Sequence, residues 1–311
     1  MIVSVDNLTH AFGATTVLRG LTFQVARGAA YGILGPNGCG KSTLFRILAT
    51  LLKPVAGAAS IDGADLRGRS SAVRRKLGVI FQASTLDGRL SVEENLVAHG
   101  HLYGVSGAAL RARVEALLQQ FDLGARRGER VSLLSGGFRR RVEIARALLH
   151  EPPVLLMDEA SAGLDPAARR AMWSALHELR ASRGLTILFT THLMDEAENA
   201  TTLLILSEGR TLAEDTPAAL KALVGGDVVS FQPAPGSAAE ALAASLRQRF
   251  PLEFRAIHGE VRVETPGGHR FLAEAMEALP GRIHAASLHR PSLEDVFVHL
   301  AGRPLEEQPH A

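Results

Sequence analysis

Short apolar runs alternate with amphipathic stretches over the first two thirds of the chain. Residues 30–34, 154–157 and 186–189 have the largely apolar pattern of buried strands, and residues 41–52 have the pattern of a helix. Strands that alternate with helices predict an α/β fold with a largely parallel sheet. Polar residues follow each strand, and ligands of such sheets bind beyond the carboxyl ends of the strands. We therefore expect these polar residues to converge at one site.

The pattern becomes helical between about residues 84 and 149. Ser91 and Glu94 have the spacing of a capping box, which begins a helix, and residues 108–121 continue as an amphipathic helix. This segment predicts a helical insertion in the α/β body.

A different pattern begins after Val224, where Gly225 and Gly226 interrupt the chain. The segments that follow predict a strand at 228–231, a helix at 238–250, a hairpin of 253–257 and 260–264, a helix at 271–279, a strand at 283–288 and a helix at 292–300. This β-α-β-β-α-β order matches a split βαβ, ferredoxin-like module. We expect two domains, residues 1–224 and a small α+β domain of residues 225–311.

Composition and charge restrict the partners that we expect for the protein. Of its 311 residues, 46% are hydrophobic and 21% are charged, and the net charge is only +2. Proteins that bind nucleic acid more often carry a concentrated basic block, and the one dense block here, residues 139–141, opens a predicted helix. We expect no nucleic-acid partner.

Cys39 is the only cysteine, so no disulfide forms within the chain and a reducing cytoplasm fits best. The first residues lack the basic start and apolar core of a signal peptide, and no apolar run approaches the roughly 20 residues of a membrane helix. We expect the chain not to cross a membrane by itself.

A glycine-rich loop follows the first predicted strand and precedes a helix. Residues 35–43 read GPNGCGKST, which is the G-x4-G-K-[S/T] pattern in the context that it requires. Backbone N–H groups of such a loop surround phosphate oxygens, Lys41 would reach the β- and γ-phosphates, and Ser42 would ligate Mg²⁺. The alternative, a glycine-rich turn with a surface lysine, fits this context poorly. The residues expected to hold the phosphates are Gly35, Asn37, Gly38, Gly40, Lys41, Ser42 and Thr43.

An acidic pair ends the second apolar strand. The strand places the carboxylate of Asp158 beside Mg²⁺, and Glu159 is positioned to polarise a water as a general base. The alternative is a pair of solvated carboxylates at the start of a loop. A phosphate-binding loop in the same chain favours the catalytic interpretation.

The sequence Leu-Ser-Gly-Gly at residues 134–137 decides the class. It resembles the LSGGQ signature of the ABC transporter ATPases, and it precedes the acidic pair as in that family. Ser-Gly-Gly alone is a common turn. Its place after the phosphate loop and before a predicted helix makes the resemblance specific, and the resemblance covers about residues 1–224.

Further motifs of this family occur in the family's order. Gln82 matches the Q-loop glutamine, which implies contacts with Mg²⁺, with the attacking water and with the membrane subunit. Asp165 lies in a stretch that resembles the D-loop of the dimer interface, and His192 matches the switch histidine that contacts the γ-phosphate. Phe12 stands where the family has an aromatic residue that stacks on adenine. Taken singly, the glutamine and the histidine fit polar caps of strands, and Phe12 fits a core residue.

The resemblance implies ATP as the substrate, Mg²⁺ as the cofactor and a site shared by two chains. Two copies would dimerise head to tail around two ATP molecules, so that the phosphate loop of one copy faces Ser135, Gly136 and Gly137 of the other. The serine and Gly137 would donate hydrogen bonds to the γ-phosphate, and the dipole of the following helix would add to that contact. The chain carries one cassette, so the second comes most simply from an identical chain.

Two motifs depart from the family pattern. Phe138 replaces the usual glutamine, so the polar contacts of that side chain are lost. The serine and the backbone donors remain, and we expect ATPase activity to persist. Ala-Ser-Ala at residues 160–162 replaces the more usual Pro-Thr-Ser, and the lost hydroxyl is expected to loosen communication between the sites.

The stretches at residues 192–198 and 291–297 resemble the ATPases of daunorubicin-resistance-type exporters, in which the ATPase and the membrane protein are separate chains. The second stretch also fits a helix capped by Ser292 that simply closes the small domain. Our leading hypothesis is an ATPase that powers export of a drug, lipid or polysaccharide through a separate permease, at the cytoplasmic face of the membrane. The alternatives are an importer ATPase with a regulatory C-terminal domain, and a soluble ABC protein that acts in DNA repair or translation.

Overall fold

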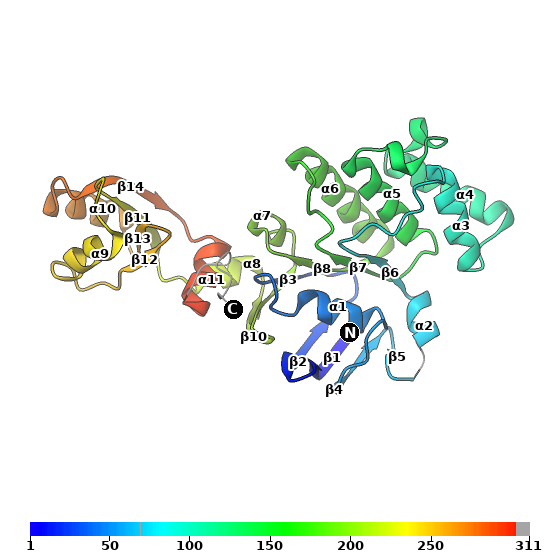
Figure 1. Cartoon of the computed structure of the whole chain (residues 1–311), viewed down its shortest axis with the longest axis horizontal. Helices are drawn as coiled ribbons and strands as arrows, with labels where there is room; N and C mark the ends of the chain where they lie inside the picture. The colour runs from blue at the N-terminus through cyan, green and yellow to red at the C-terminus, as the bar shows by residue number, and fades with distance from the viewer. Residues whose placement is uncertain (69, 303–311) are drawn as a thin grey trace. The chain divides into compact units, whose positions relative to one another are not determined.

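The computed structural model describes residues 1–68 and 70–302, which form two compact units (Figure 1). The core unit comprises Met1–Thr211 and the C-terminal unit comprises Leu212–Ala311. The glycine break at which we expected the domain boundary lies within the C-terminal unit. Residues 303–311, which the sequence assigned to the small domain, lie outside the described residues.

A six-stranded sheet forms the centre of the core unit. Its strand order is β10-β9-β3-β8-β7-β6, and β6, β7, β8, β3 and β9 pair in parallel. The strands are β3 (Ala30–Leu34), β6 (Leu77–Ile80), β7 (Val154–Asp158), β8 (Thr186–Thr191), β9 (Thr202–Ser207) and β10 (Arg210–Asp215). Every residue of β3, β7 and β8 is buried, because helices or a second sheet cover both faces. The predicted α/β fold with a largely parallel sheet is confirmed.

Helices flank this sheet on both faces, with α1 (Lys41–Leu48) below it and α5 (Gly136–Leu148) and α6 (Pro166–Arg183) above it in Figure 1. Helix α1 ends four residues before the predicted end at residue 52. The chain leaves the helix at Thr50, which takes a left-handed conformation with φ of 62°.

An antiparallel sheet in the core unit was not predicted. Its order is β2-β1-β4-β5, formed by β1 (Val3–Phe12), β2 (Thr15–Val25), β4 (Ala56–Ile61) and β5 (Ala64–Asp65). Burial alternates along much of β2, as in a strand with one face on a core and one in water. Its buried side chains, such as Leu21 and Phe23, share one hydrophobic cluster with α1 and with one face of the central sheet.

The segment between β6 and β7 is helical, as the sequence indicates. It contains α3 (Val92–Leu102), α4 (Gly107–Gln120), two short 3₁₀ turns (Gly124–Arg126 and Val131–Leu133) and α5. The capping box is confirmed, since the Ser91 side chain accepts from the Glu94 N–H and the Glu94 carboxylate accepts from the Ser91 N–H. Two further short helices of this unit are α2 (Ser70–Arg75) and α7 (Met194–Ala197).

The first helix of the C-terminal unit is α8 (Pro217–Ala222), which follows the part of β10 beyond Thr211, and the β-α-β-β-α-β order that the sequence predicts comes next. Its elements are β11 (Asp227–Pro233), α9 (Ala239–Arg247), β12 (Arg255–Ile257), β13 (Glu260–Thr265), α10 (Gly268–Ala278), β14 (Ile283–His289) and a closing α11 (Leu293–Ala301). The strands form an antiparallel sheet of order β12-β13-β11-β14. Side chains of β11 and β13 pack with α9 and α10 in a separate core around Phe231 and Phe271.

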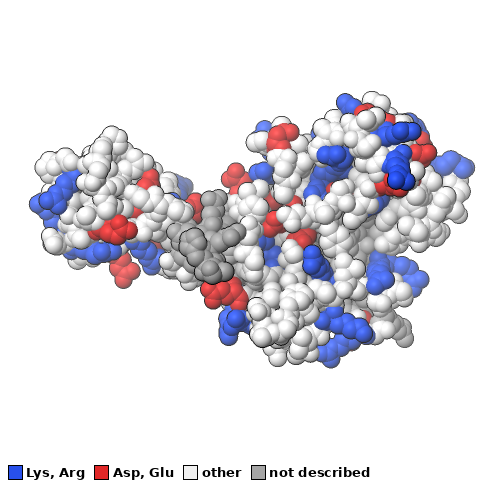
Figure 2. All heavy atoms as spheres, in the orientation of Figure 1, with Lys and Arg blue, Asp and Glu red and all other residues white. Residues whose placement is uncertain are grey.

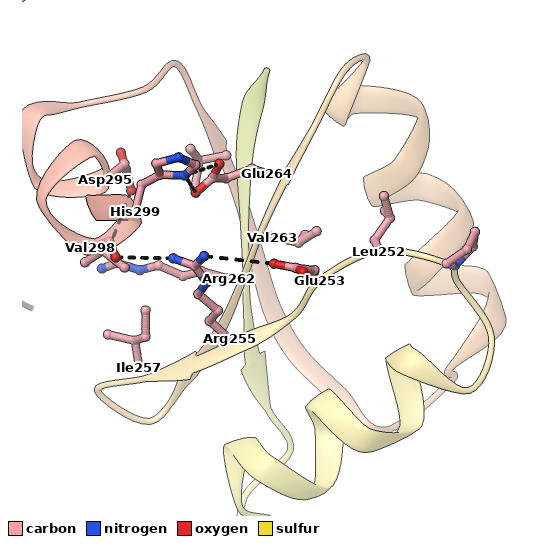
Figure 3. Close-up of a pocket in the computed structure, with 12 residues that line it drawn as sticks. Leu252, Glu253, Arg255, Ile257, Arg262, Val263, Glu264, Asp295, Val298 and His299 are labelled. Carbon is pink, nitrogen blue, oxygen red and sulfur yellow. Dashed lines mark hydrogen bonds and ion pairs between the residues drawn. The ribbon is translucent and has the colours of Figure 1, made fainter. Parts of the chain in front are cut away.

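Helix α11 borders a cavity of about 340 Å³ beside β12 and β13 (Figure 3). His299 of α11 faces Glu264 of β13 at 3.1 Å, and Arg262 of β13 pairs with Glu294 at 3.2 Å. Asp295 forms a capping box with Ser292 and lies 3.7 Å from the same guanidinium. Of the 291–297 stretch, Glu294 and Asp295 therefore hold α11 against β13 within the C-terminal unit.

Candidate nucleotide-binding site

The phosphate-binding loop connects β3 to α1 and depends on glycines for its path. A Cβ atom on Gly35 would lie 2.4 Å from the Leu206 carbonyl oxygen and 2.7 Å from Cys39 Sγ. Gly40 has φ of 112°, which other residues rarely adopt, and a Cβ there would lie 2.7 Å from Leu18. At these two positions only glycine therefore fits the path of the loop against its neighbours in the protein.

Lys41 is the first residue of α1 and is 4% exposed. Its ammonium donates to the carbonyl oxygens of Gly35 at 2.7 Å and Pro36 at 3.0 Å. Burial of an ammonium is costly unless anionic or polar partners surround it. The Lys41 side chain thus lies at the N-terminus of a helix, where anions are favoured.

The acidic pair lies at the carboxyl end of β7, next to the end of β8. Asp158 is 4% exposed and accepts a hydrogen bond from the Thr190 hydroxyl at 2.7 Å. Glu159 takes a left-handed conformation with φ of 47°, and its N–H donates to the same hydroxyl at 3.0 Å. Non-glycine residues in this conformation are uncommon and cluster at functional sites.

The bend at Glu159 aims its carboxylate at two other candidate residues. Its Oε1 lies 3.3 Å from Lys41 Nζ and 3.5 Å from His192 Nδ1. The three side chains come from α1, the end of β7 and the residue after β8. The expected convergence of polar residues beyond the strand ends is observed for them.

These residues border a cavity of about 410 Å³. It is lined by Val17, Asn37, Gly38, Gly40, Lys41, Ser42, Thr43, Gln82, Glu159, Ala162 and His192. Val17 and Ala162 were not among the predicted site residues, because neither side chain carries a chemical signal, although Ala162 lies in the stretch that resembles the D-loop. A polar cavity with a buried lysine and a helix N-terminus fits the phosphates of a nucleotide.

The residues expected at Mg²⁺ lie in or directly behind this cavity. Ser42 and Gln82 line it, and Asp158 is buried next to Glu159. No cluster of three His, Cys, Asp or Glu side chains suited to a metal occurs among residues 1–68 and 70–302. The donor set fits Mg²⁺ that takes most of its oxygen ligands from phosphate and water.

The other expected site residues do not line this cavity. Ser135 is the exposed N-cap of α5 and makes no side-chain cap hydrogen bond, and Gly136 and Gly137 form the first turn. Asp165 caps α6 by accepting from the N–H groups of Ala167 and Ala168, and these bonds hold the pKa of its carboxyl below the usual value. Phe12 ends β1, is 49% exposed and meets His10 edge to face at 4.7 Å, so it is not a core residue.

Phe138 packs inside the helical segment of its own chain. The guanidinium of Arg126 lies 4.4 Å from the ring centre, and that of Arg141 lies 5.2 Å from it. Both distances are in the range of cation–π interactions. The residue that departs from the family signature thus has two structural partners within its own chain.

Cys39 is buried in the phosphate-binding loop. Burial raises the pKa of its thiol, although Lys41 acts in the opposite direction. A thiol with a raised pKa carries little thiolate at neutral pH and is a poor nucleophile. Cys39 is thus a small filler of the loop.

The surface and the helices add two general observations. On the face shown in Figure 2, basic and acidic side chains are interspersed over the core unit. Within residues 1–68 and 70–302, no helix has the length and apolar character needed to span a bilayer.

Sequence comparisons match the chain to one family along its whole length. Residues 18–162 match the family model described as ABC transporter. A Nod factor export ATP-binding protein I of Paraburkholderia xenovorans (strain LB400) is 41% identical over 310 residues, which cover 98% of each chain. The daunorubicin resistance ATP-binding protein DrrA3 of Streptomyces coeruleorubidus is 37% identical over 314 residues, which cover 96% of each chain.

Solved structures share the fold of the core unit. A structure of an ATP-binding subunit of an ABC transporter has a TM-score of 0.67 and 34% identity, and the match covers 72% of this chain and 94% of that one. A dimeric ATP-binding cassette in a post-hydrolysis state, bound to ADP and Pi, has a TM-score of 0.64 and 28% identity. That match covers 69% of this chain and 98% of the cassette.

Proposed function

The chain belongs to the ATP-binding subunits of ABC transporters, and from this we propose that it powers export through a separate membrane permease. It is an ATPase. The observation that carries the proposal is the convergence of Lys41, Glu159 and His192 at one polar cavity. The relatives named for Nod factor export and daunorubicin resistance match the C-terminal unit as well as the core unit, which favours export of a drug, lipid or polysaccharide over import.

The phosphate-binding loop supplies positive charge and N–H donors for the bound nucleotide. The Lys41 ammonium would contact the β- and γ-phosphates, with Asn37, Gly38, Gly40 and Thr43 around them. Bound Mg²⁺ would neutralise charge on these phosphates. Ser42, Gln82 and Asp158 would hold it, directly or through water. Phe12, half exposed at the end of β1, would stack on the adenine.

Glu159 would act as the general base of hydrolysis. Its carboxylate would accept a proton from a water that attacks the γ-phosphorus, while the bond to the leaving ADP oxygen breaks. His192, 3.5 Å from that carboxylate, would orient it and contact the γ-phosphate. Gln82, which also lines the cavity, would position the water.

Two copies of the chain would complete each site. Ser135, Gly136 and Gly137 are placed on an exposed helix start, away from the cavity of their own chain. Such a helix N-terminus suits a γ-phosphate bound by a second copy. Asp165, which caps α6, would lie at the same interface.

Purification from membranes tests the transport role. The affinity-tagged chain is expected to carry with it a polytopic membrane protein that spans the bilayer. The complex would place this chain at the cytoplasmic face as a peripheral subunit. Recovery with ribosomes or DNA and without a membrane protein would reject the proposal.

A further inference from the structure

Helix α5 contacts the loop that contains Gln82 through two arginines. Arg140 donates from Nη1 to the Phe81 carbonyl oxygen at 3.0 Å and from Nη2 to the Gln82 carbonyl oxygen at 3.4 Å. Six residues later, about one and two-thirds turns along the helix, Arg146 donates to the Thr85 carbonyl oxygen at 2.7 Å and to the Thr85 hydroxyl. The backbone that follows β6 is therefore bonded to side chains of one helix.

The first of these arginines is itself held by a buried carboxylate. Arg140 and Glu143 form an ion pair in which the side chains are only 9% and 6% exposed. Because the partners lie three residues apart on one helix face, the pair fixes the guanidinium relative to the helix. A planar guanidinium can bond a carboxylate and two carbonyl oxygens at the same time, which an ammonium does poorly.

Helix α5 also begins at the signature. Ser135 is its N-cap, and Arg140 is the fifth residue of the helix, so little more than one turn separates them. A helix moves as a stiff unit over this length. A displacement of the signature would therefore carry the carbonyl oxygens of Phe81 and Gln82 with it.

We propose that the buried Arg140–Glu143 pair positions Gln82, and that it couples the signature helix to the catalytic cavity of the same chain. Gln82 lines that cavity together with Lys41 and Glu159. In the two-copy arrangement, the signature grips the nucleotide of the other copy, so the pair links the two sites of the dimer. This inference rests on the proposed function, and it assigns Arg140 and Glu143 as positioning residues.

A double-mutant cycle on the full chain tests the proposal. Arg140→Met with Glu143→Leu removes both charges together, so no unpaired charge stays buried. We expect kcat to fall by about tenfold to a hundredfold, because small misplacements of a positioned group have effects of this size. The Kd for ATP, measured by equilibrium binding, should change less than about twofold, because Lys41 is untouched. Arg140→Lys, which keeps the charge, should lower kcat without loss of folding.

The cycle is completed with Gln82→Ala. If the pair acts through Gln82, adding Arg140→Met with Glu143→Leu to Gln82→Ala lowers kcat no further. The matched control is Arg113→Met with Glu151→Leu. Arg113 also pairs with a carboxylate, that of Glu151, at 2.7 Å. Its guanidinium donates to the Leu149 carbonyl oxygen at 3.3 Å. Neither of these bonds reaches the 81–85 loop. This control should keep the kcat of the wild type.

Three results would overturn the inference. A wild-type kcat in both Arg140 variants would show that the pair does not position the loop. A full further loss of kcat in the Gln82→Ala background would show that the pair acts elsewhere. Wild-type chain without ATPase activity would reject the proposed function itself, which distinguishes that failure from a failure of the coupling.

Discussion

At the scale of single residues, the cavity is organised around Glu159. Its left-handed backbone directs one carboxylate oxygen to within 3.3 Å of Lys41 and 3.5 Å of His192. Lys41 and His192 therefore hold in place the carboxylate that we propose as the general base.

Glu159→Gln removes the base and keeps the shape of the side chain. We expect ATP binding to persist, kcat to fall by about 10²- to 10⁴-fold, and an ATP-bound dimer to accumulate in size-exclusion chromatography. Glu178→Gln, on an exposed position of α6, is the control and should behave as the wild type. If Glu159→Gln turns over ATP at the wild-type rate, the assignment of the general base is wrong.

Phe138 has a structural task that the family signature does not suggest. Phe138→Ala removes the ring that the guanidinium groups of Arg126 and Arg141 contact, so we expect the Tm to fall by about 2–4 °C while ATPase activity persists. Phe138→Tyr keeps the ring and should melt like the wild type. Thermal unfolding with and without ATP gives the comparison. An unchanged Tm for the alanine variant would show that the ring contributes no net stability.

The sequence identified nearly all residues of the cavity, because each belongs to a local motif with its own spacing. Their convergence was also predictable, since the motifs follow strands of one parallel sheet. The contact of Arg140 with Phe81 and Gln82 was not, because it joins residues far apart in the chain. No local pattern indicates which of three successive arginines turns inward.

At the scale of elements too, features that depend on local sequence were predictable, and features that depend on contacts between distant segments were not. Continuous apolar runs predicted the buried strands β3, β7 and β8. The antiparallel sheet was missed, because half-buried strands such as β1 mix polar and apolar residues, and register shifts interrupt its pairing with β2. The capping box of α3 was predicted from two residues, since it depends on local geometry alone.

An aromatic cluster of His99, Tyr103 and His150 lies between α3 and the end of α5. His99 and His150 lie 5.8 Å apart, and Tyr103 stacks on His150 at 3.8 Å. Burial, with Arg146 near the first ring and Arg113 near the second, lowers the pKa of each histidine to about 4. The neutral rings are therefore favoured in the folded state.

The sign of the pH dependence follows from this shift. The unfolded state binds protons at these two histidines more tightly than the folded state does. The contribution of the neutral rings to the free energy of unfolding is therefore complete above the ordinary pKa of 6.5, and it is lost as the pH falls from there toward 4. We expect the Tm to drop between pH 7.5 and pH 5, and His150→Phe, which keeps an aromatic ring, to reduce the drop. His101→Phe, at an exposed position, is the control. An equal drop in the Tm of both variants would contradict the assignment of the pH dependence to the buried histidines.

At the scale of the whole molecule, we propose that the chain is one half of a catalytic assembly. Its cavity is lined by the phosphate-binding loop, Glu159 and His192, while Ser135 and Asp165 do not line it. This separation is what a site shared by two copies predicts. A solved cassette that resembles this chain is a dimer.

Mixing two inactive variants tests the shared site most directly. Lys41→Ala disables the phosphate-binding loop, and Ser135→Arg blocks the exposed signature, so each variant alone is expected to be inactive. In a head-to-tail dimer of one copy of each, one site has an intact loop and an intact signature. An equimolar mixture should then recover about a quarter of the wild-type ATPase activity, because about half of the dimers are mixed and each has one complete site. An inactive mixture of folded variants, or full activity of Ser135→Arg alone, would contradict the shared site.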